Sequence, residues 1–359
     1  MKICHITVLN PVDHTRILKY NKTFLKLGHE VTVIGKTPYP PTFINPKVQY
    51  YSTGKINRFF LHRIKTHVKI FFWWLQNFSQ IDIFWIHTPE LFWLFFLNRF
   101  FKKKQVYDVH ENYFENTYHA NYYAKIMRVP LAYLVRGLEK IISKIAFVVY
   151  AEYSYENILT AQNYKIITNT FECELIKELK IQYSEIPTFV ISGNLSEEWG
   201  IMEAIDFWET QNQFEPTFLT IIGYASLPSF AKKIRERINQ SPYKERCQLI
   251  GIEEYVPYNE IIKTIAQSNI VLAPYQKKKK FEKKIPTKFY EAIALNKTIL
   301  FSDNAYWNTL NETYQFGICI QDWKSRWEYQ NLQHHCPKEF YSWEAQKEKI
   351  EKIIQRMKK

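Results

Sequence analysis

The chain has 359 residues, of which 46% are hydrophobic and 23% charged, a composition typical of a globular protein long enough for two domains. Only nine glycines and no internal repeat are present, which argues against fibrous and repeat architectures. Lys and Arg outnumber Asp and Glu by 48 to 35, and the resulting charge of +13 favours phosphate-rich partners: nucleic acid, anionic lipid or anionic small molecules. The alternative is that the basic residues only solubilise the surface.

Cysteines and apolar stretches narrow the class of protein further. The five cysteines are scattered and include no CxxC pair, so no zinc ribbon or disulfide framework is predicted and a reducing, cytoplasmic compartment is favoured. The first residues resemble a strand rather than a signal peptide. The apolar stretches Phe71–Leu75 and Leu91–Phe101 are shorter than the roughly 20 residues of a spanning helix.

The first half of the chain alternates β-rich runs with helical patterns. In chain order it predicts a strand at Lys2–Leu9, a helix at Asp13–Leu27, strands at Val31–Gly35 and Ile81–His87, a helix at Pro89–Lys104, a strand at Gln105–His110, a helix at Tyr122–Ser143, and strands at Ala146–Ala151 and Tyr164–Thr168.

The pattern restarts after a polar, charged seam over residues 169–187. Strands are predicted at Thr188–Ser192, Phe218–Gly223, Cys247–Ile250, Ile270–Pro274, Thr298–Ser302 and Gly317–Ile320, with helices at Gly200–Glu209, Ser229–Asn239, Tyr258–Gln267 and Thr287–Leu295. This alternation predicts two α/β domains with parallel sheets, over residues 1–170 and 183–336, followed by an amphipathic helix in 337–359.

The sharpest candidate site is the predicted helix start at Pro286. Proline suits the first helical position, and Ile285 before it has no capping side chain, so the free N–H groups are open to an anion. Lys288 and Glu291 are three residues apart and share a helix face. The pair can hold a diphosphate and a ribose, or it can be an ordinary surface ion pair.

A lysine-rich loop lies just upstream of this helix. It contains Lys277–Lys280, Lys283 and Lys284 around Phe281 and Glu282. Such a run is usually a solvated loop, but this one follows a predicted strand at the sheet edge where ligands bind. Both interpretations, a phosphate contact and a solvated surface, remain open.

Taken in order, several short motifs form a recognisable set. They are Ser192-Gly193-Asn194-Leu195, Trp199-Gly200-Ile201, Ile222-Gly223, Ile250-Gly251, Ala273-Pro274-Tyr275, Pro286-Thr287-Lys288 and Glu291-Ala292. The set resembles the donor domain of retaining glycosyltransferase family 4, which has the GT-B fold. Asp13–Ile17, Gly28–Val31 and Asp108–Glu111 resemble the acceptor-side loops of that family. The resemblance covers nearly the whole chain and implies two Rossmann-like domains facing a central cleft, with the C-terminal helix returning to the first.

The resemblance also implies roles for matching residues. Glu291 looks like the carboxylate that holds the donor ribose, Lys288 like a diphosphate contact, and His110 like a residue near the transferred sugar. Further donor-binding residues would be Gly193, Asn194, Gly223, Gly251, Pro286 and Thr287, and the acceptor-side residues would be Asp13, Arg16 and Glu111. The alternatives are a core or capping role for His110 and a helix N-cap role for Asp13.

The sequence departs from the family at three positions. Trp199 stands where many relatives have a basic residue, Asn194 where some have arginine, and Lys283 where the first of two paired glutamates is usual. We therefore expect Lys288 and the 277–284 loop to supply the positive charge at the donor diphosphate.

The predicted function is transfer of a sugar from a nucleoside-diphosphate sugar to a glycan or lipid-linked acceptor, with retention, in surface polysaccharide or glycan assembly. No cofactor and no metal are expected, and no nucleic acid, because no known nucleic-acid module is present. Alternatives are a sugar-nucleotide epimerase and a noncatalytic, degenerate transferase of the same fold.

The composition of the segment Arg58–Gln76 suggests where in the cell the protein acts. Its aromatic and basic residues interleave at helical spacing, as in helices that lie on an anionic bilayer, so peripheral attachment to the inner face of the cytoplasmic membrane is one prediction. The alternative is a core-facing helix with a basic outer face.

Overall fold

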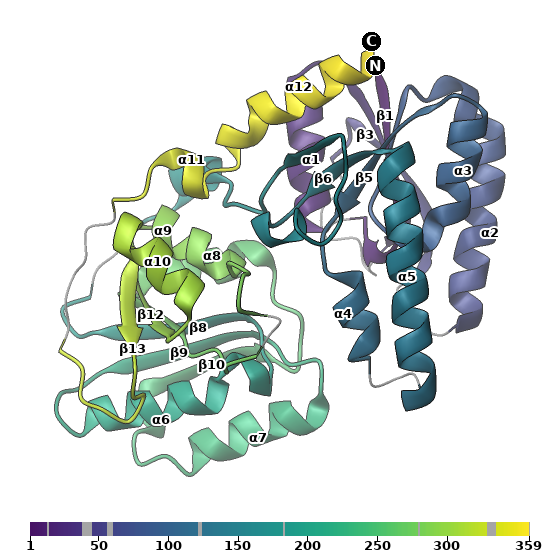
Figure 1. Ribbon diagram of the computed structural model, residues 1–359. Helices are drawn as coiled ribbons and strands as arrows, with labels where there is room; N and C mark the ends of the chain where they lie inside the picture. Colours follow the sequence, from purple (N-terminus) through teal and green to yellow (C-terminus); the bar gives the residue numbers. More distant parts are fainter. Residues whose placement is uncertain are drawn as a thin grey trace. The chain divides into compact units, whose positions relative to one another are not determined.

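The computed structural model describes residues 1–12, 14–37, 45–55, 60–120, 124–181, 184–278, 281–328 and 335–358. The chain divides into two compact units: unit 1 comprises Met1–Asn169 and Gln346–Lys359, and unit 2 comprises Thr170–Ala345 (Figure 1). Each unit is a parallel sheet with helices packed on it, so the predicted class, α/β with two Rossmann-like sheets, is confirmed.

The described part of unit 1 contains a seven-stranded parallel sheet in the order β3-β2-β1-β4-β5-β6-β7. Its strands are β1 Lys2–Pro11, β2 Glu30–Thr37, β3 Val48–Lys55, β4 Ile83–Ile86, β5 Lys104–Val109, β6 Phe147–Tyr150 and β7 Tyr164–Ile166. Every residue of β4 and β6 is buried, as expected for parallel strands covered on both faces.

The two faces of this sheet are covered by different helices. The helices of unit 1 are α1 Thr15–Lys26, α2 Phe60–Asn77, α3 Phe92–Phe100, α4 Tyr113–Tyr118, α5 Lys125–Ile145 and α12 Lys347–Lys358. Side chains from α2, α3 and α5 join one core cluster with residues such as Ile6 and Val148. On the opposite face His5 stacks on Phe24 of α1 at 5.3 Å, and Arg356 of α12 lies over the Phe147 ring at 5.7 Å.

Unit 2 repeats the architecture with a six-stranded parallel sheet in the order β10-β9-β8-β11-β12-β13 among its described residues. The strands are β8 Thr188–Asn194, β9 Phe218–Tyr224, β10 Cys247–Ile252, β11 Ile270–Ala273, β12 Thr298–Ser302 and β13 Gly317–Ile320. The helices are α6 Ile201–Asn212, α7 Pro228–Asn239, α8 Tyr258–Gln267, α9 Thr287–Ala294, α10 Ala305–Tyr314 and α11 Lys338–Tyr341. Two core clusters, one on each face, enclose the sheet.

The segment predicted as one crossover helix over 337–359 is divided between the units. Helix α11 belongs to unit 2, where the Phe171 N–H donates to the Tyr341 carbonyl at 2.7 Å and the Trp343 N–H donates to the Phe171 carbonyl at 2.7 Å. Helix α12 belongs to unit 1 and buries Ile350, Ile353 and Ile354, which are one stripe of the amphipathic pattern.

Some elements differ from the sequence-based prediction. The helix predicted to reach Lys104 ends at Phe100, because the chain turns at Lys102, which has a φ of 54°, and Lys104 begins β5. Strand β3 and helix α10 were not predicted. The side chain of Asn304 caps α10 by accepting from the Tyr306 and Trp307 N–H groups. None of the described helices combines the length and apolar character needed to cross a membrane.

Two glycines of unit 2 are required by close backbone packing. A Cβ atom on Gly223 would lie 1.7 Å from the Gly193 carbonyl oxygen, and a Cβ on Gly200 would lie 1.7 Å from the Pro274 carbonyl oxygen. Both residues also have positive φ, at 147° and 71°, which side chains disfavour. The carboxyl edge of this sheet can therefore be built only with hydrogen at these positions.

We expect Gly223→Ala to destabilise the protein by at least about 2 kcal/mol, because the new methyl group overlaps a backbone carbonyl that cannot move without breaking the strand pairing. Gly137→Ala is the matched control: Gly137 lies in α5 with open space around its Cβ position, so alanine should stabilise by roughly 0.5–1 kcal/mol. Chemical denaturation of both variants measures the difference. Equal effects of the two substitutions would contradict this account.

Candidate functional site

Polar side chains gather at the carboxyl edge of each sheet, where parallel α/β sheets bind ligands. In unit 1 they come from β1, α1 and the residues at the ends of β4 and β5. In unit 2 they come from the starts of α8 and α9 and from the loops after β8 and β11.

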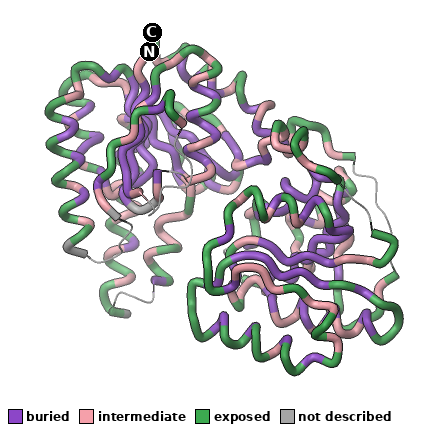
Figure 2. The backbone as a smooth tube through the Cα atoms, turned by 180° about the vertical axis from the view of Figure 1, so that it is seen from behind, coloured by how far each residue is buried: buried purple, intermediate pink, exposed green. Residues whose placement is uncertain are grey.

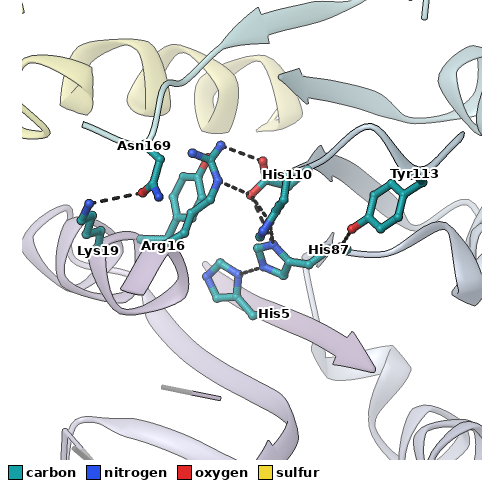
Figure 3. A network of polar contacts seen from close by, with 9 residues as sticks. His5, Arg16, Lys19, His87, His110, Tyr113 and Asn169 are labelled. Carbon is teal, nitrogen blue, oxygen red and sulfur yellow. Dashed lines mark hydrogen bonds and ion pairs between the residues drawn. The ribbon is translucent and has the colours of Figure 1, made fainter. Parts of the chain in front are cut away.

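A buried ion pair lies at the centre of the unit 1 cluster (Figure 3). The Arg16 guanidinium donates from Nε to Asp108 Oδ2 at 3.0 Å and from Nη2 to Oδ1 at 2.8 Å. The two side chains are 1% and 0% exposed. Burial alone raises the pKa of Asp108, but Arg16 and His110 outweigh it and hold this pKa well below its usual value. Asp108 is therefore a fixed anion, and such bidentate pairing is the geometry arginine favours.

Three histidines extend from the Asp108 carboxylate in a chain. His110 Nε2 lies 3.0 Å from Asp108 Oδ2 and 2.7 Å from His87 Nδ1, and His87 Nε2 lies 2.8 Å from His5 Nδ1. Burial lowers the pKa of His87 to about 4 and that of His5 well below its usual value, so both rings are neutral at pH 7. The Tyr113 hydroxyl donates to the His87 carbonyl at 2.9 Å and fixes the backbone there.

Two tautomer arrangements fit the contacts with Asp108. An ionised Asp108 can only accept, and His110 Nε2 at 3.0 Å and His87 Nδ1 at 3.2 Å both lie within range of its Oδ2. With the proton on His110 Nε2, His87 Nδ1 accepts and His87 donates from Nε2 to His5. His110 Nδ1 is left as an acceptor, buried and without a hydrogen-bond partner among the described residues.

A second unsatisfied ring nitrogen lies beside it. The His14 ring is 5.7 Å from the His110 ring between centroids, and His14 Nδ1 is also buried without a partner in the described chain. Buried polar atoms are usually satisfied, so two adjacent exceptions mark a place for a ligand hydroxyl or a water molecule.

The ligand atoms of His87, Asp108 and His110 lie within 4.8 Å of one another, which is compatible with a metal ion. However, Arg16 already occupies both Asp108 oxygens, and a divalent cation there would lie beside a fixed positive charge. The residues fit a hydrogen-bonded ion pair better than a metal centre.

The predicted acceptor-side residues do not share one environment: one is buried, one is exposed and one lies outside the described residues. Arg16, predicted to face the acceptor, is buried and donates to Asp108 and to the Tyr20 hydroxyl at 3.0 Å, because a charged carboxylate in the core requires a counter-charge. Glu111 is exposed after β5 and accepts from the Asn116 side chain. Asp13 lies outside the described residues.

In unit 2 the predicted glycines form one row. Gly193, Gly223 and Gly251 pair in register across β8, β9 and β10, at the carboxyl end of each strand. Asn194 ends β8 and is exposed. Cβ atoms on Gly223 and Gly251 would lie 1.7 and 2.6 Å from the carbonyl oxygens of Gly193 and Gly223, so close packing of the strand ends requires glycine at both positions.

The start of α9 differs in one respect from the prediction. Pro286 is the N-cap rather than the first helical residue, since its ψ is 141°, and Thr287 begins the helix. No side chain caps the first turn. The N–H groups of this turn are therefore free of side-chain caps, as an anion-binding helix start requires.

Lys288 and Glu291 are both buried, so the alternative of an ordinary surface ion pair is wrong. The Lys288 ammonium lies over the rings of Trp199 and Tyr275, 4.9 and 5.2 Å from their centroids. Burial lowers the pKa of Lys288 to about 8, although Glu291 opposes the shift. The Tyr258 hydroxyl donates to Glu291 Oε1 at 3.1 Å. Trp199, which departs from the family pattern, therefore forms a cation–π contact with the lysine.

The lysine-rich loop lines a cavity of about 580 Å³ together with the start of α10. Lys277 pairs with Asp303 at 2.8 Å and Lys278 with Glu198 at 2.9 Å. Lys279 and Lys280 lie outside the described residues. These carboxylates partly neutralise Lys277 and Lys278. Lys288 is therefore better placed than these two lysines to act as a positive group at α9.

His14, Asp108 and Tyr275 lie within the motifs that carry the family resemblance but were given no role of their own. His5, His87 and Tyr258 were not predicted as site residues either. His87 and Asp108 could have been found: His87 ends the predicted strand Ile81–His87, and Asp108 lies two residues before the end of the predicted strand Gln105–His110. His5 could not, because only the strand order brings it beside His87.

No protein-family model and no curated protein matches the chain in sequence. Solved structures do match. Sucrose-phosphate synthase of Thermosynechococcus elongatus is 13% identical with a TM-score of 0.66, over 90% of this chain and 86% of that one. HepE of Anabaena in complex with UDP and glucose is 12% identical with a TM-score of 0.61, over 90% and 86%. A glycosyltransferase of Rickettsia africae is 12% identical with a TM-score of 0.60, over 89% and 84%. The chain has the GT-B fold, as predicted.

We expect Asp108→Asn to cost about 3–5 kcal/mol of stability, because it leaves the Arg16 guanidinium buried without its counter-charge. Glu348→Gln removes an exposed carboxylate from its ion pair with Lys352 and should leave the unfolding midpoint unchanged. Urea titrations followed by circular dichroism compare the two variants with the parent. A tolerated Asp108→Asn would show that the pair is not what organises the histidines.

Proposed function

We propose that the protein is a glycosyltransferase that moves a sugar from a nucleoside-diphosphate sugar to a hydroxyl of a glycan or lipid-linked oligosaccharide, with retention. The observation that carries the proposal is the buried Lys288–Glu291 pair on the uncapped first turns of α9. A positive group, free N–H groups and a carboxylate are what a diphosphate joined to a ribose requires. The fold supports the same donor class, since one matching structure holds UDP and glucose.

In this proposal the donor lies against unit 2. The diphosphate contacts Lys288 and the N-terminus of α9, through Pro286 and Thr287, and the ribose hydroxyls donate to Glu291. Tyr258 orients the carboxylate. The glycine row of Gly193, Gly223 and Gly251, with Asn194, lets the donor approach the sheet edge.

The reaction breaks the bond between the anomeric carbon and the diphosphate oxygen and forms one to the acceptor oxygen. The acceptor proton and the nucleoside diphosphate leave. Negative charge grows on the leaving group, so a positive group fixed in place before reaction stabilises the transition state more than the ground state. Lys288 is held by two rings and does not need to reorganise.

The proposal gives the unit 1 network a positioning role and one direct contact. Asp108, Arg16 and His87 hold His110 so that Nδ1 accepts a hydrogen bond from a sugar hydroxyl. Acceptor recognition falls to the surrounding loops, including Glu111 and Asp13. We propose surface polysaccharide or other glycan assembly at the cytoplasmic face of a membrane as the setting.

A panel of sugar nucleotides, screened by thermal shift and then by release of nucleoside diphosphate, tests the function. Binding with release that depends on an acceptor is the expected result. An altered sugar nucleotide formed without acceptor would favour an epimerase, and binding without release under any acceptor would favour a noncatalytic protein.

Lys288→Ala should weaken nucleoside-diphosphate binding by about tenfold or more, because a charge-assisted contact to phosphate is lost. Lys297→Ala is the matched control: burial also lowers the pKa of Lys297 to about 8, but this lysine follows the C-terminal end of α9. Calorimetry with a nucleoside diphosphate measures both variants. Unchanged affinity in Lys288→Ala would remove the assignment.

The affinity for a nucleoside diphosphate should also weaken as the pH rises, and it should do so at a lower pH than the pKa of an ordinary lysine would give. Because the pKa of Lys288 is about 8 rather than its ordinary 10.5, the ammonium is present at pH 7 and is lost as the pH rises above 8. We expect affinity to be constant below pH 7 and to weaken from about pH 8, while Lys288→Arg remains flat through pH 10. The stability of the free protein changes in the opposite direction. Between pH 8 and 10.5 Lys288 is protonated in the unfolded chain but largely neutral in the folded one, so the free energy of unfolding rises with pH. Calorimetry across pH checks the first effect, and a parent profile as flat as that of the arginine variant would contradict it.

A further inference from the structure

Exposed apolar side chains in the described chain are concentrated on one side of unit 1. More than half of the exposed large apolar residues belong to three helices, α2, α3 and α5, if Phe101, which follows α3, is included. On α2 they recur as Ile64, Val68, Phe71, Phe72 and Leu75, at the spacing of one helical stripe.

This stripe is a second apolar face, distinct from the one that the fold uses. The inward face of α2 places Ile70, Trp73 and Trp74 in the core. A helix that packs on a sheet needs one such face, and its opposite face is normally polar. Phe72 is nevertheless 57% exposed on the outside.

The neighbouring helices continue the same surface. Helix α3 exposes Phe92, Phe96 and Phe100, at intervals of four residues, and Phe100 is 78% exposed. Helix α5 exposes Ile126, which is 84% exposed, and Tyr133 and Leu134 two turns later.

The three helices lie beside one another (Figure 1). The Phe71 ring of α2 contacts the Trp93 ring of α3 at 5.8 Å between centroids, Trp74 donates to Asn98 at 2.9 Å, and α3 packs against α5. Figure 2 shows these helices buried toward the sheet and exposed along their outer edges.

The charges on these helices have one sign. Neither α2 nor α3 contains an acidic residue, and the sole acidic residue of α5, Glu139, is buried and accepts from the Tyr107 hydroxyl. Exposed basic residues accompany the apolar ones on each helix: Lys65, Lys69, Arg99, Lys140 and Lys144.

We propose that the outer face of α2, α3 and α5 docks on an anionic lipid bilayer. Aromatic and aliphatic side chains enter the headgroup region and the surrounding lysines contact lipid phosphates, the arrangement by which interfacial helices bind. A second copy of the chain fits less well, because the same positive charges would meet across the interface. The surface includes α2, which corresponds to most of the predicted segment Arg58–Gln76, and extends it to two further helices.

Docking itself does not depend on the proposed transfer reaction. Only its purpose, access to a lipid-linked acceptor, rests on that function. The two can be tested apart, because vesicle binding is measured without donor or acceptor and donor binding is measured without lipid.

The test is flotation of the full chain with vesicles of phosphatidylcholine alone and of phosphatidylcholine mixed with phosphatidylglycerol. We expect binding only to the mixed vesicles, weakening with added salt. Phe72→Glu with Phe100→Glu should weaken binding at least tenfold, since two apolar anchors are lost. Lys65→Glu with Lys69→Glu should weaken it by about fivefold or more for each charge.

Phe214→Glu with Phe218→Glu is the matched control, because these residues of unit 2 are 53% and 41% exposed, lie at the amino end of β9 away from the ligand-binding edge, and are outside the docking surface. It should bind vesicles like the parent. All variants should keep the parent circular dichroism and nucleotide affinity, which separates lost docking from lost folding. Equal binding to both vesicle types, or parent-like binding of the Phe72 and Phe100 variant, would overturn the proposal. So would light scattering that shows a dimer of the parent and a monomer of that variant, because the face would then join two copies.

Discussion

The ion pair between Arg16 and Asp108 organises the polar interior of unit 1. A carboxylate with no exposed surface is tolerated only with a counter-charge, and the guanidinium meets both of its oxygens. With Asp108 fixed as an acceptor, a ring nitrogen that donates to it must carry a proton, and His110 Nε2 and His87 Nδ1 are both in range. The orientation of His110 thus follows from a pair in which it does not take part. Arg16 comes from α1 and Asp108 from β5, so the same pair also ties a helix to the middle of the sheet.

In unit 2 burial acts on the charge of a lysine, Lys288, rather than on that of an ion pair. Lys288 is surrounded by aromatic rings rather than by oxygen atoms, and its ammonium is therefore closer to neutrality than that of an ordinary lysine. Such a group gains more from an arriving anion than a solvated lysine does, because no water shell has to be displaced first. In the proposed donor site, Trp199 takes the place of a basic residue, because its ring shapes the environment of a lysine that comes from α9.

The sequence predicts features that depend on residues close together in the chain, and it does not predict contacts between residues far apart in the chain. The strand and helix alternation is a local pattern, and it was sufficient for the fold. The glycine row and the Lys288–Glu291 spacing are also local patterns, and they single out residues of the proposed donor site. The burial of that pair was not predictable, because it requires Trp199 and Tyr275 from other loops to pack over one lysine. His5 joins His87 only because β1 lies beside β4, across many intervening residues. The proline at α9 was misplaced by one position, since cap and first turn differ only in backbone angles.

The division of the chain has a consequence for biosynthesis. Helix α12 covers the sheet face that α1 also covers, and its Ile350, Ile353 and Ile354 are buried there, yet its codons follow all of those for unit 2. On the ribosome, unit 1 emerges first but must wait with part of one sheet face uncovered while the whole of unit 2 is translated. The second unit to be synthesised is therefore the first that can complete its core, and the core of unit 1 closes only after α12 is released.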